Sequence, residues 1–187
     1  MKIVCFGGKG QHGKDTSANY LKGFLEDHGY KIVIIHYADL LKFICKTWFG
    51  WDGEKDDYGR ALLQQIGTDI IRAQDPDYWV NFVADFLSKF KTIWDYVLIP
   101  DCRFPNEINR LKESGFDTIY VRVNRTNFIS PLTEEAQNHI SEIALDDYPA
   151  DYYLENSGNK AELRNKIIPL ISALIEGGEM TDGNNRT

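Results

Sequence analysis

The chain reads Gly8-Lys9-Gly10-Gln11-His12-Gly13-Lys14-Asp15-Thr16 directly after the apolar run Ile3-Val4-Cys5-Phe6. A strand, a glycine-rich turn and a helix in this order form a phosphate loop, in which backbone N–H groups and the start of the helix face phosphate oxygens. Lys14 adds a mobile cation, and a plain glycine-rich turn would not explain a lysine at this position. We therefore predict a nucleotide phosphate site on this loop, formed by Gly8, Gly10, Gly13, Lys14, Asp15 and Thr16.

The residue after Lys14 departs from the usual pattern, which places serine or threonine directly after the lysine. Here Asp15 takes that place and Thr16 follows it. A carboxylate at this position could ligate Mg²⁺ with an added charge, while Thr16 could give its hydroxyl to a donor phosphate. The sequence leaves open whether Asp15 would contact the metal directly or through water.

The composition excludes several classes of protein. The 187 residues carry a formal net charge of −7, and the pI is near 5.1, which argues against a nucleic-acid polymer as the main partner. No apolar run approaches the roughly 20 residues that span a bilayer, and a strand begins at once, so we expect neither a membrane segment nor a signal peptide. Cys5, Cys45 and Cys102 lack metal-ligand spacing, so we expect free thiols in the cytoplasm.

Short apolar runs alternate with stretches of helical spacing along the chain. The strands are expected at 2–6, 31–37, 96–100, 118–123 and 151–154. The helices are expected at 16–27, 40–47, 61–72, 78–90, 105–113 and 161–175. This order predicts an α/β protein, a three-layer α/β/α sandwich with a mainly parallel five-stranded sheet. Ligands of such sheets bind at the carboxyl ends of the strands.

Two stretches are longer than a minimal α/β connection requires. We expect one domain over residues 1–178 and a flexible polar tail at 179–187. The excess in 38–91 predicts a helical insertion that binds the acceptor of a phosphoryl group. The excess in 124–149 predicts a lid that closes over the donor.

The end of the third expected strand carries a second candidate site. Asp101 ends the apolar run that begins at Tyr96, and a carboxylate there can hold Mg²⁺ beside a phosphate loop. A loop-capping aspartate is the alternative. Arg103 follows two residues later, and Pro105 is well placed to open the next helix. Arg103 would then lie above the sheet, where its guanidinium can bind phosphate oxygens in a forked arrangement.

The expected insertion contains two less specific features. Arg72 lies off the apolar face that Ile66 and Ile70 share, so it is either functional or a solvated helix arginine. Tyr78 and Trp79 could form the wall of a base pocket, although aromatic residues in helices more often belong to the core.

The expected lid contributes a cation and a short polar motif. Arg125 follows the fourth expected strand at the root of the lid, where it could reach the transferring phosphoryl group. His139 and Glu142 are three residues apart on an expected helix. Two ligands are too few for a metal site, so we interpret this pair as lid or hinge contacts.

Together these pieces resemble the phage-type deoxynucleoside monophosphate kinases, a family of P-loop kinases. The likeness covers about residues 2–170 and rests on six local matches. The matches are Gly13-Lys14-Asp15-Thr16, Tyr37-Ala38-Asp39-Leu40-Leu41-Lys42, Leu63-Gln64-Gln65-Ile66-Gly67-Thr68 with Arg72, Asp101-Cys102-Arg103-Phe104-Pro105-Asn106-Glu107, His139-Ile140-Ser141-Glu142 and Glu155-Asn156-Ser157-Gly158. An aspartate after the lysine is usual in this family, whereas Leu40 and Asn138 stand where relatives often have proline and aspartate.

The resemblance implies a donor ATP on the phosphate loop, with adenine against Asn156 and Gly158. It implies an acceptor nucleotide held by residues of the insertion and by one arginine beyond it. These are Asp39, Lys42, Gln65, Arg72, Trp79 and Arg103. The residues expected to act in catalysis are Lys14, Asp101, Arg103 and Arg125.

The sequence therefore predicts ATP- and Mg²⁺-dependent phosphoryl transfer to a deoxynucleoside monophosphate, which gives the diphosphate. Two alternatives remain at this point: a kinase for another small phosphorylated metabolite, and a non-catalytic nucleotide-binding switch. The base, the sugar and the choice between monomer and homodimer are left open.

Overall fold

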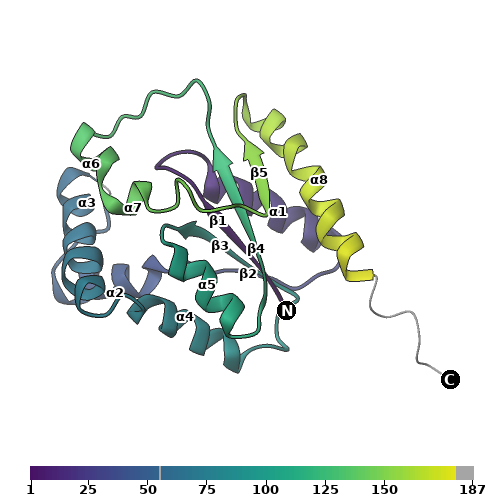
Figure 1. Cartoon of the computed structure of the whole chain (residues 1–187), viewed down its shortest axis with the longest axis horizontal. Coiled ribbons are helices and arrows are strands. Elements are labelled where there is room, and N and C mark those ends of the chain that lie inside the picture. Colours follow the sequence, from purple (N-terminus) through teal and green to yellow (C-terminus); the bar gives the residue numbers. More distant parts are fainter. Residues whose placement is uncertain (55, 180–187) are drawn as a thin grey trace.

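A computed structural model describes residues 1–54 and 56–179, with side chains described as far as Ile175. Its centre is a five-stranded sheet in the order β2-β3-β1-β4-β5, and all four neighbouring pairs are parallel. The strands are β1 (Lys2–Gly7), β2 (Ile32–Ile34), β3 (Tyr96–Cys102), β4 (Asp117–Asn124) and β5 (Tyr152–Glu155). The predicted fold class is thereby confirmed (Figure 1).

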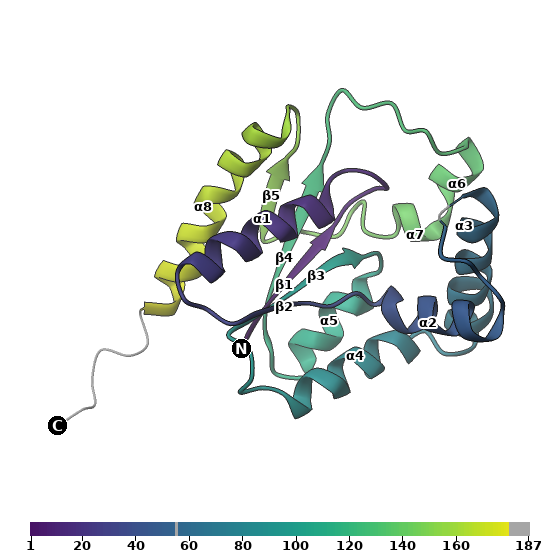
Figure 2. The ribbon, with the colours of Figure 1, turned by 180° about the vertical axis from the view of Figure 1, so that it is seen from behind.

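Helices cover both faces of the sheet, α1 and α8 on one face and α2, α4 and α5 on the other (Figures 1 and 2). The helices are α1 (Lys14–Asp27), α2 (Ala38–Trp48), α3 (Asp57–Gln64), the π-helix η1 (Gln65–Arg72), α4 (Tyr78–Lys89), α5 (Pro105–Glu113), α6 (Glu134–Asn138), α7 (Ile140–Ile143) and α8 (Lys160–Glu179). Of the expected tail, Glu179 ends α8, and residues 180–187 lie outside the described residues.

The central strand is buried on both faces, which explains its unbroken apolar run. Val4 and Phe6 pack with α1 and α8, while Ile3 and Cys5 face the helices of the other layer. Successive side chains of a strand point to opposite faces, so one strand supplies both halves of the core. The apolar face of α8 is thus occupied by the sheet. No helix of the described residues is long and apolar enough to cross a membrane.

The second strand is shorter than the predicted 31–37. β2 ends at Ile34, and the N–H of Ile35 makes one more bond to the Leu98 oxygen at 3.0 Å. The N–H groups of Tyr37 and Ala38 then donate to the two carboxylate oxygens of Asp101, each at 3.0 Å. The chain turns into α2 early because Asp101 binds the backbone donors that a longer strand would have used.

The expected helix at 61–72 begins earlier and changes type midway. It starts as α3 at Asp57, and it widens into η1 from Gln65 onward. The carbonyl oxygen of Gly67 accepts a bond from Trp79 Nε1 at 3.0 Å, and a Cβ at Gly67 would lie 2.5 Å from Leu41 Cδ2. Tertiary contacts therefore fix this turn. π-Helical turns are frequent at functional sites, and hydrophobic spacing does not distinguish them from α-helix.

The region expected as a lid contains α6 and α7, and α6 lies beside α3 in both views (Figures 1 and 2). The expectation of one helix that carries both His139 and Glu142 is wrong. His139 has extended backbone angles, φ −61° and ψ 141°, and it separates α6 from α7. Its side chain caps α7 by accepting the N–H of Ser141 at 3.3 Å.

Candidate active site

The phosphate loop between β1 and α1 has a shape that only glycine permits at two positions. Gly8 has φ +132°, and a Cβ there would lie 2.2 Å from the Val123 oxygen. Gly13 has φ +98°, and a Cβ there would lie 2.7 Å from Asn156 Nδ2. Both angles lie in the left-handed region that favours glycine. The loop is therefore seated closely against the carboxyl ends of β4 and β5.

Lys14 curls back over this loop. Its Nζ donates to the carbonyl oxygens of Gly8 at 2.7 Å and Lys9 at 2.8 Å, and the residue is only 6% exposed. Burial, assisted by the nearby Arg103 charge, lowers the pKa of Lys14 to about 7. A phosphate anion beside Nζ would favour the charged form and raise this pKa again.

We expect nucleotide binding to take up a proton at Lys14. At pH 8 a group with a pKa near 7 is mostly neutral, so binding of a non-hydrolysable ATP analogue should consume up to about one proton per site. Titration calorimetry in buffers of different ionisation enthalpy measures this number, which should fall as the pH is lowered to 6. Lys14→Arg is the control, because arginine stays charged. Equal proton uptake by the two proteins would contradict the prediction.

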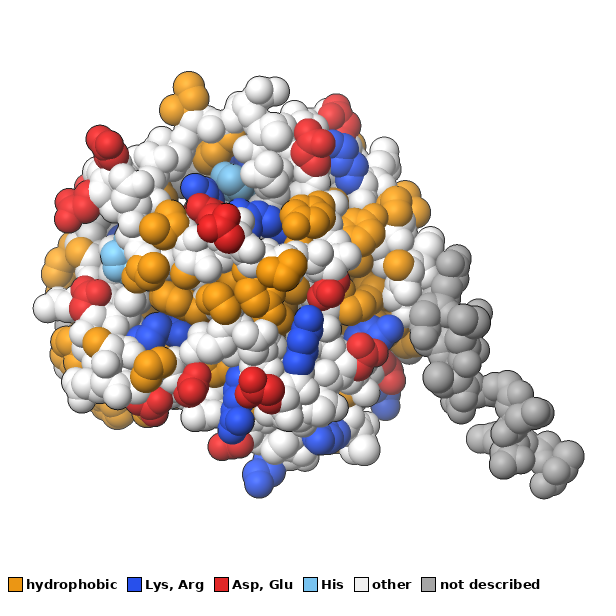
Figure 3. Space-filling model, viewed as in Figure 1, with side chains coloured by type: hydrophobic (Ala, Val, Ile, Leu, Met, Phe, Trp, Pro, Cys, Tyr) orange, Lys and Arg blue, Asp and Glu red, His pale blue; other side chains and the backbone are white. Residues whose placement is uncertain are grey.

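Two arginines from distant parts of the chain contact the same loop. Arg103 Nη1 donates to the oxygens of Gly8 and Ser141, both at 3.4 Å. Arg125 Nη1 donates to the Gln11 oxygen at 3.3 Å, and its guanidinium lies 4.4 Å from the Phe128 ring centre. The loop thus has cations from the end of β3 and from the root of the lid. Charged side chains of both signs and a histidine gather in this region of the surface (Figure 3).

The two candidate metal-binding carboxylates have different surroundings. Asp15 is mostly exposed, and its carboxylate lies 3.2 Å from His36 Nε2, a bond that raises the pKa of His36. Asp101 is half-buried, desolvation raises the pKa of its carboxyl group, and its carboxylate caps the start of α2. The capping alternative for Asp101 is therefore observed, and its metal function stays a prediction.

Asp15 and Asp101 fit a magnesium ion that substrate phosphates help to hold. The described residues contain no group of three or more histidine, cysteine, aspartate or glutamate side chains that could hold a metal. Mg²⁺ commonly uses only one or two carboxylates, together with phosphate oxygens and water. A carboxylate has about four acceptor positions, so Asp101 can accept two N–H groups and still bind a metal-bound water.

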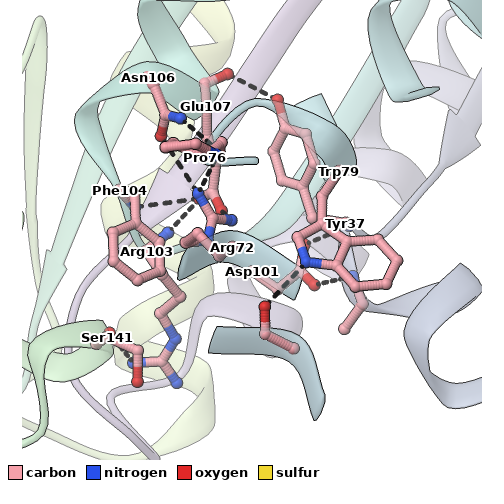
Figure 4. Close-up of polar contacts among 12 residues, drawn as sticks. Tyr37, Arg72, Pro76, Trp79, Asp101, Arg103, Phe104, Asn106, Glu107 and Ser141 are labelled. Carbon is pink, nitrogen blue, oxygen red and sulfur yellow. Dashed lines mark hydrogen bonds and ion pairs between the residues drawn. The ribbon is translucent and has the colours of Figure 1, made fainter. Parts of the chain in front are cut away.

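Arg72 is far from the solvated helix arginine that the sequence left possible. Its Nη2 lies 2.6 Å from Glu107 Oε1, and its side chain is 11% exposed. Nη1 donates to the Pro76 oxygen at 3.2 Å and to Asn106 Oδ1 at 3.3 Å, while the guanidinium lies 4.0 Å from the Phe104 ring centre. Figure 4 shows Arg72 enclosed by these partners from α5 and the segment before α4.

Glu107 is the main residue that sequence reasoning missed, since the sequence shows it only as the last residue of the match that begins at Asp101. It is 2% exposed, and it accepts the N–H groups of Arg103 at 2.5 Å and Phe104 at 3.0 Å in addition to the Arg72 contact. Burial raises the pKa of Glu107 to about 7, against the opposing effect of Arg72. Glu107 thereby fixes the backbone that presents Arg103.

Two cavities lie along the side of η1 and the lid. The smaller, of about 100 Å³, is lined by Tyr37, Ala38, Leu41, Leu63, Gly67, Thr68, Arg72, Trp79, Asp101, Arg103, Phe104, Glu107 and Ser141. The larger, of about 770 Å³, is lined by Gln11, Asp57, Arg60, Ala61, Gln64, Asp69, Pro131, Leu132, Thr133, Glu135, Ala136 and His139. Neighbouring residues of α3, η1 and the lid line both, and the larger volume is of the size that small-molecule ligands occupy.

The candidate acceptor residues are only partly brought together. Trp79 is 4% exposed, so it belongs to the core while its edge lines the smaller cavity with Arg72 and Arg103. Asp39 and Lys42 do not line either cavity, and they form an ion pair with each other on α2 at 3.2 Å. Gln65 is exposed, whereas its neighbour Gln64 lines the larger cavity.

The residues expected to contact adenine lie behind the phosphate loop. Asn156 Nδ2 donates to the His12 oxygen at 3.0 Å, and its backbone N–H donates to the Asn124 oxygen at 2.7 Å. Gly158 follows in the turn before α8, where a Cβ would meet the Glu162 carboxylate at 1.7 Å. The structure therefore gives Asn156 a supporting contact to the loop.

Comparison with protein families now identifies the group to which this fold and site belong. The model of the family described as "Deoxynucleotide monophosphate kinase" matches residues 49–167. The chain belongs to the deoxynucleotide monophosphate kinase family. The resemblance inferred from the local motifs is confirmed, although the matched residues begin after the phosphate loop.

Individual relatives of this chain differ in how much of their length aligns with it. The deoxynucleotide monophosphate kinase of Enterobacteria phage T4 is 34% identical over 110 residues, which are 58% of this chain and 43% of that protein. The chain thus spans less than half the length of this relative. A protein of Acanthamoeba polyphaga mimivirus is 30% identical over 203 residues, which cover 90% of this chain and 95% of that protein.

Solved structures support the fold independently of the family. A gluconokinase from Sinorhizobium meliloti superposes with a TM-score of 0.54 at 14% identity, over 97% of this chain and 97% of that one. At this identity the likeness concerns the fold alone, a parallel α/β sandwich.

Proposed function

We propose that this chain catalyses Mg²⁺-dependent transfer of the γ-phosphoryl group of ATP to a deoxynucleoside monophosphate. The family match carries the proposal, and the convergence of Lys14, Arg103 and Arg125 on one glycine loop supports it. A phosphate acceptor is already nucleophilic and needs little help from a general base. Positioning and charge neutralisation would therefore provide most of the catalysis.

On the donor side, the ATP phosphates would bind residues 8–16, and adenine would lie near Asn156 and Gly158. Lys14 would release the loop carbonyls and turn its ammonium toward the phosphates. Mg²⁺, when bound beside Asp15 and Asp101, would neutralise charge on the phosphate oxygens. Arg103 and Arg125 would complete this cationic enclosure from two sides, and closure of the lid would exclude water.

On the acceptor side, the proposed residues are Asp39, Lys42, Gln65, Arg72, Trp79 and Arg103, of which the last three line one cavity. Because the nitrogens of Arg72 are held by Glu107, Asn106 and Pro76, it would act as a fixed charge. The larger cavity, with Gln64 in its wall, would accommodate the nucleoside. We place residues 38–91 as the acceptor region and 124–149 as the lid, in a cytoplasmic monomer or homodimer.

We expect Asp101→Asn to raise the Mg²⁺ concentration needed for half-maximal turnover by on the order of 10-fold, because a carboxylate that orients the hydrated metal is lost. Magnesium titrations of ADP release measure this. Asp95→Asn is the matched control: Asp95 lies before the other end of β3 and accepts the Lys31 N–H at 2.7 Å. If both substitutions reduce only thermal stability, Asp101 has a capping function alone.

The direct test is ADP release with ATP and Mg²⁺ against every nucleoside and deoxynucleoside monophosphate. Stimulation by one or a few deoxynucleotides would establish the kinase and name its acceptor. Stimulation only by other phosphorylated metabolites would favour a different small-molecule kinase of the same fold. Slow hydrolysis that no acceptor stimulates would favour a nucleotide-binding switch.

A further inference from the structure

A carboxylate of the lid lies on the phosphate loop. The N–H of Gly10 donates to Glu142 Oε2 at 2.6 Å, and Arg103 Nη1 lies 2.6 Å from Glu142 Oε1. The Glu142 side chain is only 10% exposed. A glycine-loop N–H and a guanidinium are the donors with which such loops bind phosphate oxygens. Glu142 therefore presents an anion to two groups that the substrate would be expected to use.

The carboxylate is carried by α7, which is held mainly by polar contacts, while the next core residue along the chain is Leu145, just after the helix. None of the residues of α7 is buried, in contrast to the helices that cover the sheet. Arg103 also donates to the Ser141 oxygen at 3.4 Å, and His139 Nε2 lies 3.9 Å from Asp69 Oδ1. A segment with few buried apolar contacts can open locally at low free-energy cost.

We propose that Glu142 is an internal competitor for phosphate: its carboxylate occupies the Gly10 N–H and the Arg103 guanidinium until a nucleotide phosphate displaces it. The inference rests on the proposed function in one respect, that phosphate is the ligand of this loop. Two anions at the same donors would repel each other, so phosphate binding requires the carboxylate to leave. Displacement transfers both donors to the phosphate and moves α7 with Glu142.

This arrangement has two consequences for the site. Before phosphate binds, Arg103 is already positioned beside the loop, with its charge paired. The free energy needed to separate Glu142 from its partners reduces the free energy of phosphate binding. The affinity for phosphate is therefore lower than it would be for the same loop without Glu142. Glu142 thus links the state of the lid to occupancy of the loop.

The test compares the wild type with Glu142→Gln, which keeps the shape of the side chain and an acceptor for the Gly10 N–H but removes the charge. The probe is inorganic tripolyphosphate, and its affinity is measured by titration calorimetry at fixed ionic strength. Loss of one charge-assisted pair should tighten binding by on the order of 10-fold. Glu134→Gln, at an exposed position of α6, is the control and should bind as the wild type does.

Unchanged or weaker binding by folded Glu142→Gln would overturn the proposal. If that variant does not fold, Glu142→Asp serves instead, because its shorter side chain cannot hold both partners. Hydrogen exchange of the wild type gives a separate result. Tripolyphosphate should increase exchange of the α7 amides, and increased protection would count against displacement. Because the probe is not a nucleotide and no turnover is measured, failure of the nucleotide kinase assignment would be seen separately in the ADP-release panel.

Discussion

Lys14→Met is expected to lower turnover by on the order of 10²- to 10³-fold, measured as ADP release at saturating nucleotides. The substitution removes the cation that would face the transferring phosphoryl group, while methionine keeps most of the apolar stem. Lys14 is only 6% exposed, so a side chain of similar length is needed to fill the space that it occupies. The effect should fall on kcat more than on the KM for ATP, because the charge on the phosphoryl group changes most in the transition state.

The structure adds a condition to this experiment. Lys14 Nζ donates to two loop carbonyls, at 2.7 and 2.8 Å. The substitution removes both hydrogen bonds, and each carbonyl oxygen that stays buried without a donor reduces the free energy of unfolding by about 1–3 kcal/mol. Thermal unfolding must therefore accompany the kinetics, to show that the variant is folded at the assay temperature. A folded Lys14→Met protein with wild-type turnover would refute the proposed mechanism.

Glu107→Ala is expected to reduce the free energy of unfolding by about 3–5 kcal/mol at pH 8, where the buried carboxyl group is ionised. It leaves the guanidinium of Arg72 without its closest partner, and it leaves two N–H groups before α5 without their acceptor. Single domains have only about 5–15 kcal/mol of stability, so the loss is large. Urea unfolding measures it, and Glu113→Ala at the exposed end of α5 should change stability by less than about 0.5 kcal/mol.

A double-mutant cycle separates the ion pair from the rest of this loss. Combined with Arg72→Met, Glu107→Ala should cost less than the sum of the two single substitutions, because the double variant buries no unpaired charge. Strictly additive effects would show that Glu107 acts only through the N–H groups of Arg103 and Phe104. Either result measures how strongly η1 depends on the start of α5.

Much of the fold could be predicted from the sequence because its signals are local. Strands buried on both faces appear as continuous apolar runs, and the glycine loop is identified within nine consecutive residues, 8–16. Pro105 at the start of α5 and the carboxyl-end positions of Asp101 and Arg103 follow in the same way. The order of the strands, β2-β3-β1-β4-β5, was not predicted, because the general rules for parallel sheets allow several orders.

The polar contacts of the site depend on residues far apart in the chain. Arg72 and Glu107 are 35 positions apart, and Gly10 and Glu142 are 132 positions apart. Neither carboxylate has a spacing that marks it as a partner, since each could equally be a solvated residue of its own helix. The same holds for η1, where Trp79 and Leu41 fix a turn that hydrophobic periodicity treats as ordinary helix.

The sequence by itself determined the layers of the sandwich, the phosphate loop and the cations that could serve it, because backbone conformation and burial on a sheet are encoded over short stretches. Only the tertiary structure decided that Asp101 caps α2, that Arg72 is bound by Glu107 and that Glu142 occupies the loop. The physical reason is that charge pairing and donor satisfaction depend on distance in space. Short stretches of sequence do not encode that distance.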